Sequence, residues 1–96
     1  MDDEVIKKII EDLIREGVIN LKHPKLSRNI PFQIQQADES VIEKIAKKYN
    51  IPPEEIYNIT TAKIARILGE MENVTKIKQP NGYRYMINDD LNDWKK

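Results

Sequence analysis

The spacing of apolar residues predicts an amphipathic helix at the start of the chain. Over residues 2–16 the apolar positions recur with the helical period, acidic residues cluster at the amino-terminal end, and Gly17 follows. Early acids favour the positive end of the helix dipole, and a glycine after the last periodic residue is typical of a helix end. The apolar stripe consists of Val5, Ile6, Ile9, Ile10, Leu13 and Ile14. We expect this stripe to pack into the core, the commoner outcome, or against a second copy of the chain.

The helical period is lost over residues 17–36. Pro24 and Pro31 are unfavourable inside a helix, whereas Phe32 and Ile34 alternate with polar residues as in a strand. The charged side chains of this segment are all basic: Lys22, Lys25 and Arg28. We therefore predict a basic loop followed by a short strand over about 32–36. The basic loop, which includes residues 22–28, is either a solvated connection, the commoner case, or a contact for nucleic acid.

Two helices are predicted in the middle of the chain. Ser40 and Glu43 have the spacing of a capping box, which predicts a helix over 40–49 that begins at Ser40. Asn50 allows this helix to stop. Pro52-Pro53, followed by acidic residues, predicts a second, short helix over about 53–58, because proline is tolerated in the first turn.

A third helix is predicted over residues 61–72, with Thr60 as its N-cap. Its apolar side is formed by Ile64, Ile67, Leu68 and Met71. Small and charged residues lie on the opposite side: Ala62, Lys63, Arg66, Gly69 and Glu70. This side can be an ordinary solvated face, or it can approach a nucleic-acid groove closely while Lys63 and Arg66 reach phosphates or base edges.

The segment 74–87 has the pattern of a β-hairpin. Pro80-Asn81-Gly82 suits a three-residue loop closed by a glycine bulge. This loop pairs Gln79 with Tyr83, Ile77 with Tyr85 and Thr75 with Ile87. One face then carries Ile77, Tyr83, Tyr85 and Ile87, and the other carries Lys76, Lys78, Arg84 and Met86. The predicted hairpin therefore has an apolar side and a cationic side. Tyr83 lies near the tip, so of the two hairpin tyrosines it is the better candidate to remain exposed.

Composition and charge indicate one small domain. The chain has 96 residues, of which 33% are charged, and its formal net charge is zero. The charge is unevenly distributed, with a net charge of +3 over 17–36 and +3 over 60–87. A neutral chain does not coat nucleic acid by bulk electrostatics, but a polarised one can bind it in a single orientation. The abundance of lysine and isoleucine hints at a thermophilic source.

The expected compartment is the cytoplasm. The absence of cysteine excludes disulfides and thiolate metal sites. No apolar run reaches the roughly 18 residues of a membrane span, and the acidic start lacks the basic residues of a secretion signal.

No residue pattern points to catalysis, a metal or a cofactor. His23 is the only histidine, precedes Pro24 and has no neighbouring nucleophile. Asp89, Asp90 and Asp93 lack the glycine and glutamate of a calcium loop. The three glycines form no phosphate-binding loop. We therefore expect neither an enzyme nor a small-molecule binding protein, and we assign residues 88–96 to a polar tail that either forms a last turn or frays.

The order of elements over residues 40–87 resembles the winged helix-turn-helix superfamily, which has three helices followed by a two-stranded wing. The expected fold is thus α+β, mainly α, with an additional N-terminal helix over 2–16. The helix that begins Thr60-Thr61 and the tyrosine-rich second wing strand are also similar to winged-helix domains of phage and plasmid replication proteins. The resemblance implies double-stranded DNA as the partner, with helix 61–72 in the major groove and wing 74–87 on the backbone.

Carried over to this sequence, the resemblance implies nine DNA-contacting residues. They are Thr61, Ala62, Lys63, Arg66 and Gly69 on the recognition helix, and Lys76, Lys78, Asn81 and Arg84 on the wing. The implied role is a transcriptional regulator or a replication accessory. The alternative is a winged-helix module that binds another protein and never contacts DNA. A second copy of the chain, bound through helix 2–16 as a homodimer, is another candidate partner.

Overall fold

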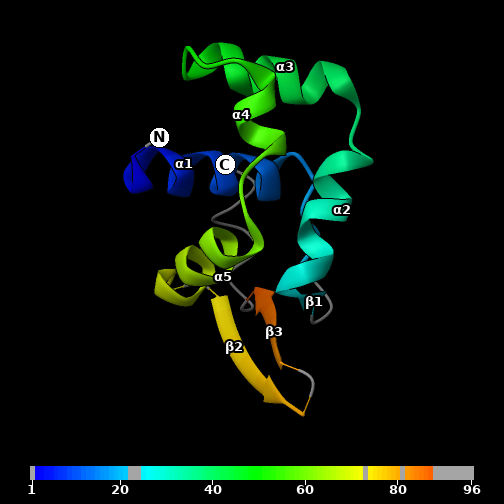
Figure 1. The fold of residues 1–96 in the computed structure, drawn as a ribbon, viewed down its shortest axis with the longest axis vertical. Coiled ribbons are helices and arrows are strands. Elements are labelled where there is room, and N and C mark those ends of the chain that lie inside the picture. Colours follow the sequence, from blue (N-terminus) through cyan, green and yellow to red (C-terminus); the bar gives the residue numbers. More distant parts are fainter. Residues whose placement is uncertain (1, 22–24, 73, 81, 88–96) are drawn as a thin grey trace.

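The computed structural model describes residues 2–21, 25–72, 74–80 and 82–87. The described chain is mainly helical with a small antiparallel sheet (Figure 1). The helices are α1 (Asp3–Arg15), α2 (Ile30–Gln35), α3 (Glu39–Lys48), α4 (Pro53–Tyr57) and α5 (Thr61–Glu70), with a 3₁₀ turn, η1, at Ser27–Asn29. The strands are β1 (Lys25–Leu26), β2 (Val74–Gln79) and β3 (Gly82–Ile87). The predicted tail over 88–96 and His23 lie outside the described residues.

Helix α1 confirms the prediction for residues 2–16. Asp2 caps it by accepting a hydrogen bond of 3.3 Å from the Glu4 amide, and Asp3 and Glu4 follow in the first turn. The helix ends where Gly17 adopts a φ of 81°, a conformation that glycine takes without steric cost. The apolar stripe is buried within the chain itself, with Ile9, Ile10 and Leu13 fully inaccessible. The stripe therefore packs into the core of its own domain.

The predicted strand over 32–36 is wrong, because this segment is helix α2. Ile30 and Ile34 are both buried and stand one helical turn apart, whereas Phe32 between them is 67% exposed. Pro31 lies in the first turn, where its missing amide hydrogen costs nothing. The strand of this region is instead β1, within the segment predicted as a loop.

Helices α3 and α4 are close to the predicted ranges, but α3 is capped differently. Asp38, not Ser40, is its N-cap, and its carboxylate accepts hydrogen bonds from the Ser40 amide and hydroxyl. An ionised carboxylate is the stronger acceptor for the positive end of a helix, which explains the shift by two residues. Asn50 ends α3 at a φ of 57°. Helix α4 is a single short turn ahead of α5.

The hairpin forms between the predicted strands, but its predicted register is wrong by one residue. The observed pairs join Gln79 to Gly82, Lys78 to Tyr83, Ile77 to Arg84 and Lys76 to Tyr85. The prediction treated the hairpin as an isolated ribbon, whereas β1 also pairs with β3, in the strand order β1-β3-β2. In the observed register Tyr85, which packs into the core, shares a face of the hairpin with Lys76.

One apolar core lies between the helices and the base of the sheet. It is built mostly from isoleucines of all five α-helices, together with Ile19, Leu21, Ile59, Met71 and Tyr85. In Figure 1, α3 and α4 lie on one side of α1, and α5 with the hairpin lies on the other. The core therefore includes α1 and α2 and extends beyond the 40–87 unit predicted from sequence. Among the described helices, none has the length and apolarity required to span a membrane.

Candidate nucleic-acid interface

Helix α5 presents the face that the sequence predicted. Thr60 caps it by accepting a hydrogen bond of 3.2 Å from the Lys63 amide. Its inner face packs into the core through Ile64, Ile67, Leu68 and Met71. Ala62, Arg66 and Gly69 are exposed on the opposite face, and Thr61 and Lys63 are half-buried at its margin. The predicted helix contacts are thus all at least partly accessible to solvent.

The two cations of this face are not free, because both contact Asp3 at the start of α1. The Lys63 Nζ lies 3.1 Å from Asp3 Oδ1, and an Arg66 guanidinium nitrogen lies 2.7 Å from Asp3 Oδ2. The hydrogen bond from Lys63, reinforced by the charges of both cations, lowers the pKa of Asp3 below its usual value of 3.8. The carboxylate therefore stays ionised at neutral pH and offsets part of the positive charge of α5.

Sequence reasoning missed Asp3 as part of this face. The acids at the start of the chain were interpreted only as favourable partners of the α1 dipole, a role that Asp3 also has. The contact joins residues 63 positions apart in sequence, and no local pattern encodes that distance.

The hairpin carries its lysines on the face that also holds its tyrosines. Lys76 and Lys78 alternate along β2 and are exposed, and they stand opposite Tyr85 and Tyr83 in the sheet. The Lys76 ammonium lies 4.1 Å from the centroid of the Tyr83 ring, a cation–π contact. The predicted separation of an apolar from a cationic face is therefore wrong.

Arg84 lies on the other face of the hairpin, paired with Ile77 and half-buried. The three predicted wing cations accordingly do not form one surface. Asn81, the remaining predicted wing contact, lies outside the described residues. The described hairpin strands contain no acidic residue, so Lys76 and Lys78 have no neutralising neighbour on their own strands.

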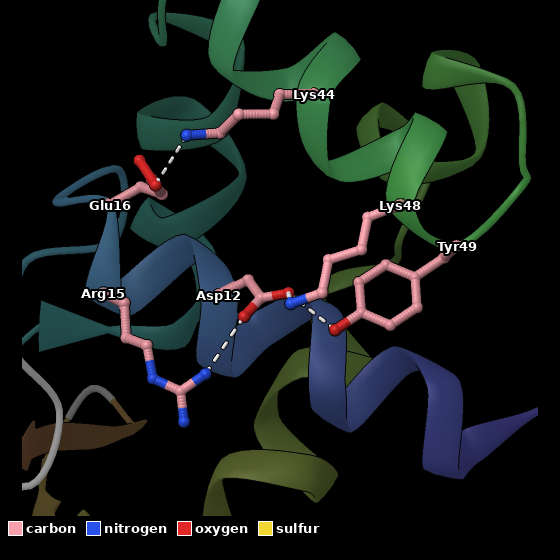
Figure 2. Close-up of polar contacts among 6 residues, drawn as sticks. All are labelled: Asp12, Arg15, Glu16, Lys44, Lys48 and Tyr49. Carbon is pink, nitrogen blue, oxygen red and sulfur yellow. Dashed lines mark hydrogen bonds and ion pairs between the residues drawn. The ribbon is translucent and has the colours of Figure 1, made fainter. Parts of the chain in front are cut away.

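A second polar cluster joins α1 to α3 (Figure 2). The Asp12 carboxylate, only 7% exposed, accepts hydrogen bonds from the Tyr49 hydroxyl at 2.6 Å and the Lys48 ammonium at 3.0 Å. Arg15 contacts its other oxygen at 3.1 Å, and Lys44 pairs with Glu16 at 2.8 Å. These contacts connect side chains of two helices, so we assign the cluster to stability.

The charge state of the cluster follows from its geometry. Burial alone would raise the pKa of Asp12, but the hydrogen bonds from Tyr49 and Lys48 and the charges of Lys48 and Arg15 outweigh it and lower that pKa. The hydrogen bond to Asp12 raises the pKa of Lys48, and burial together with the same carboxylate raises the pKa of Tyr49. The acid is thus ionised and Tyr49 and Lys48 keep their protons.

Within the described residues, no group of histidine, cysteine and carboxylate side chains is arranged to hold a metal ion. Comparisons of the chain with protein-family models, with curated proteins and with solved structures find no significant match. The functional argument therefore rests on the residues of this chain alone.

Proposed function

We propose that this chain is a small winged-helix protein that binds double-stranded DNA, as a transcriptional regulator or a replication accessory. The order that motivates this proposal is a helix-turn-helix followed by a hairpin. Helix α4 ends at Tyr57 and α5 begins at Thr61, so three residues connect them, as in many helix-turn-helix units. Strands β2 and β3 follow α5 and project away from the helices (Figure 1).

The observation that carries the proposal is the exposed, acid-free pair of lysines on β2. Lys76 and Lys78 stand on a strand that projects beyond the core, next to the helix proposed to enter the major groove. Exposed ammonium groups on strands that contain no acidic residue are suited to phosphate, whose contacts dominate DNA affinity. The small residues Ala62 and Gly69 on α5 allow close approach to a groove.

In this proposal the wing provides more of the electrostatic attraction than the helix does. Asp3 neutralises part of the charge of Lys63 and Arg66, and Glu70 adds an acid to the exposed face of α5. The helix then contributes shape and hydrogen bonds, and the lysines of β2 contribute the salt-dependent attraction to the backbone.

The proposal is tested with a Lys76→Ala, Lys78→Ala double variant and a short labelled duplex. Fluorescence anisotropy is recorded between about 50 and 200 mM salt. If both lysines contact phosphates, the slope of log affinity against log salt falls by about 0.9 for each lost contact. A matched control, Lys8→Ala with Lys47→Ala, removes two exposed lysines from α1 and α3. Equal losses in both double variants, or no loss in the first, contradict the proposed wing contact.

The second candidate function is a winged-helix module that docks onto another protein without contacting DNA. It is favoured by the pairing of both α5 cations with Asp3 and by Phe32, which is 67% exposed on α2. The same titration separates the two functions. If the Kd for duplex at low salt is larger than about 10⁻⁴ M, binding is weaker than ordinary non-specific DNA binding. That result favours the protein-binding module.

A further inference from the structure

Tyr83 is an aromatic side chain held in solvent on the hairpin. It is 42% exposed, whereas Tyr85, two residues later on the same face of β3, is 2% exposed and belongs to the core. The face of β3 therefore passes from the interior to solvent between these tyrosines. Tyr83 lies beyond the edge of the core, next to the turn.

The position of the Tyr83 ring is fixed by its lysine neighbours. Lys78 is its direct partner across the hairpin, and the Lys76 ammonium lies 4.1 Å from the ring centroid. A cation at that distance covers one face of an aromatic ring and restricts its rotation. The wing thus presents a restrained aromatic ring together with two ammonium groups.

This combination matches the chemistry of an unpaired nucleotide. Exposed aromatic rings stack on bases of single strands, and lysines beside them contact the phosphates that join those bases. The bases inside a duplex already stack on each other and offer only their edges in the grooves. An aromatic ring on a wing gains stacking only where a base is unpaired.

We propose that the wing is a binding site for an unpaired base, with Tyr83 as the stacking surface and Lys76 and Lys78 as phosphate contacts. The site deepens the proposed function and rests on it, because it uses the same wing lysines. It places the preferred target at a duplex with an unpaired segment, and a single strand serves as the probe of this site. Before nucleic acid binds, the contact with Lys76 restrains the Tyr83 ring.

The test compares two labelled strands of equal length, each about 12 nucleotides, a size within the range of single-strand sites. One is oligothymidylate, and the other has the same backbone but only abasic sites. Both carry the same phosphate charge, and only the first can stack. The 96-residue protein is titrated with each strand by fluorescence anisotropy at one salt concentration.

Tyr83→Ala is expected to weaken oligothymidylate binding at least about fivefold and to change abasic-strand binding less than about twofold. Tyr83→Phe keeps the ring and should retain affinity within about threefold of wild type. Phe32→Ala is the matched control, because it removes the other large exposed aromatic side chain of the described residues, on α2. It should leave both affinities unchanged.

The inference is overturned if Tyr83→Ala weakens both strands equally, or if Phe32→Ala has the same effect as Tyr83→Ala. These outcomes differ from failure of the proposed function. If the wild type binds duplex with the expected salt dependence while Tyr83→Ala has no selective effect, only the unpaired-base site is lost. If the wild type binds neither duplex nor either strand, the DNA-binding proposal fails with it.

Discussion

Asp3 and Arg66 lie 63 residues apart in sequence and form an ion pair of 2.7 Å between the carboxylate and the guanidinium. The other carboxylate oxygen contacts Lys63 at 3.1 Å. The start of α1 is thereby joined to the exposed side of α5, and a single acid faces both cations of that helix. A phosphate that uses Lys63 and Arg66 has to compete with this carboxylate.

Replacement of Asp3 by asparagine is therefore expected to strengthen duplex binding. Loss of the carboxylate frees the charge of Lys63 and Arg66, and we expect affinity to rise about two- to fivefold at low salt and the gain to shrink as salt screens it. Anisotropy titrations at low and high salt measure this change. The melting temperature should change little, because the pair is exposed.

Glu43→Gln is the control for Asp3→Asn, since it removes one acid from an exposed position on α3. A general effect of net charge would strengthen binding to the same extent in both variants. If both variants gain equally, or if Asp3→Asn binds duplex as the wild type does, Lys63 and Arg66 do not contact DNA.

The Asp12–Tyr49 hydrogen bond is expected to contribute to the stability of the packing between α1 and α3. Asp12→Ala should lower the free energy of unfolding by about 1–3 kcal/mol, because it leaves the partly buried Tyr49 hydroxyl without its acceptor. Tyr49→Phe should cost about 1 kcal/mol. Urea unfolding of both single variants and the double variant gives the coupling energy.

If the bond contributes as expected, the double variant costs less than the sum of the single variants. Strict additivity would show that Asp12 and Tyr49 act independently. The Lys44–Glu16 pair supplies the comparison, because both side chains are more exposed than Asp12. Glu16→Gln should cost less than about 1 kcal/mol.

The same carboxylate predicts how stability depends on pH. The pKa of Asp12 is below its usual value of 3.8 in the folded protein. Its contribution is therefore complete above about pH 4, the unfolded value, and is lost as pH falls through the folded pKa. The difference in unfolding free energy between wild type and Asp12→Ala, measured from neutral to acid pH, should narrow as pH falls through the folded pKa of Asp12. A constant difference down to the lowest pH would contradict the assignment.

At alkaline pH, the difference in unfolding free energy between wild type and Asp12→Ala reports less specifically on the polar cluster of Asp12, Lys48 and Tyr49. The raised pKa values of Lys48 and Tyr49 stabilise the fold up to their ordinary values of 10.5 and 10.0, and this contribution is lost as pH rises through the folded values. Burial also raises the pKa of Tyr85, which is independent of Asp12. Some alkaline loss should therefore persist in Asp12→Ala.

Helices α1, α3, α4 and α5 could be predicted because their signals are local. The stripe of α1, the Thr60 cap and the buried side of α5 each depend on spacings within a few turns, and all three are confirmed. For the proposed DNA-contacting residues, the exposed positions of α5 followed from the same helical period. Local pattern was sufficient for α1 and α5, whose apolar faces extend over several turns, but not for the short helix α2.

The errors arose where a distant segment decides between local alternatives. Phe32 and Ile34 alternate as in a strand, yet burial of Ile30 and Ile34 one turn apart made the segment helical. In the hairpin, β2 pairs with β3 one residue away from the predicted register, and β3 also pairs with β1, a strand outside the hairpin. The pairing of Asp3 with α5 likewise depends on how α1 packs against α5.

Replacement of glycine by alanine should change the stability of the protein in opposite directions at Gly17 and Gly69. Gly17 has a φ of 81°, and Gly69 lies inside α5; neither would bring an added methyl within 4 Å of another group. Gly17→Ala should destabilise the protein by about 1 kcal/mol through backbone strain. Gly69→Ala should stabilise it by about 0.5–1 kcal/mol, because alanine is the better helix former. Thermal unfolding of both variants measures the contrast.

Gly69→Ala also tests the proposed position of α5 in the groove. The substitution adds a methyl group on the exposed face without disturbing the core, so a change in DNA affinity cannot be attributed to unfolding. If this part of α5 lies against DNA, the more stable variant should bind duplex at least about threefold more weakly, since close approach between surfaces depends on small side chains. Gly17→Ala, at the end of α1, is the control and should bind as the wild type does at a temperature where both are folded. Unchanged or stronger binding by Gly69→Ala would place the carboxyl-terminal half of α5 outside the groove and leave the wing as the main contact.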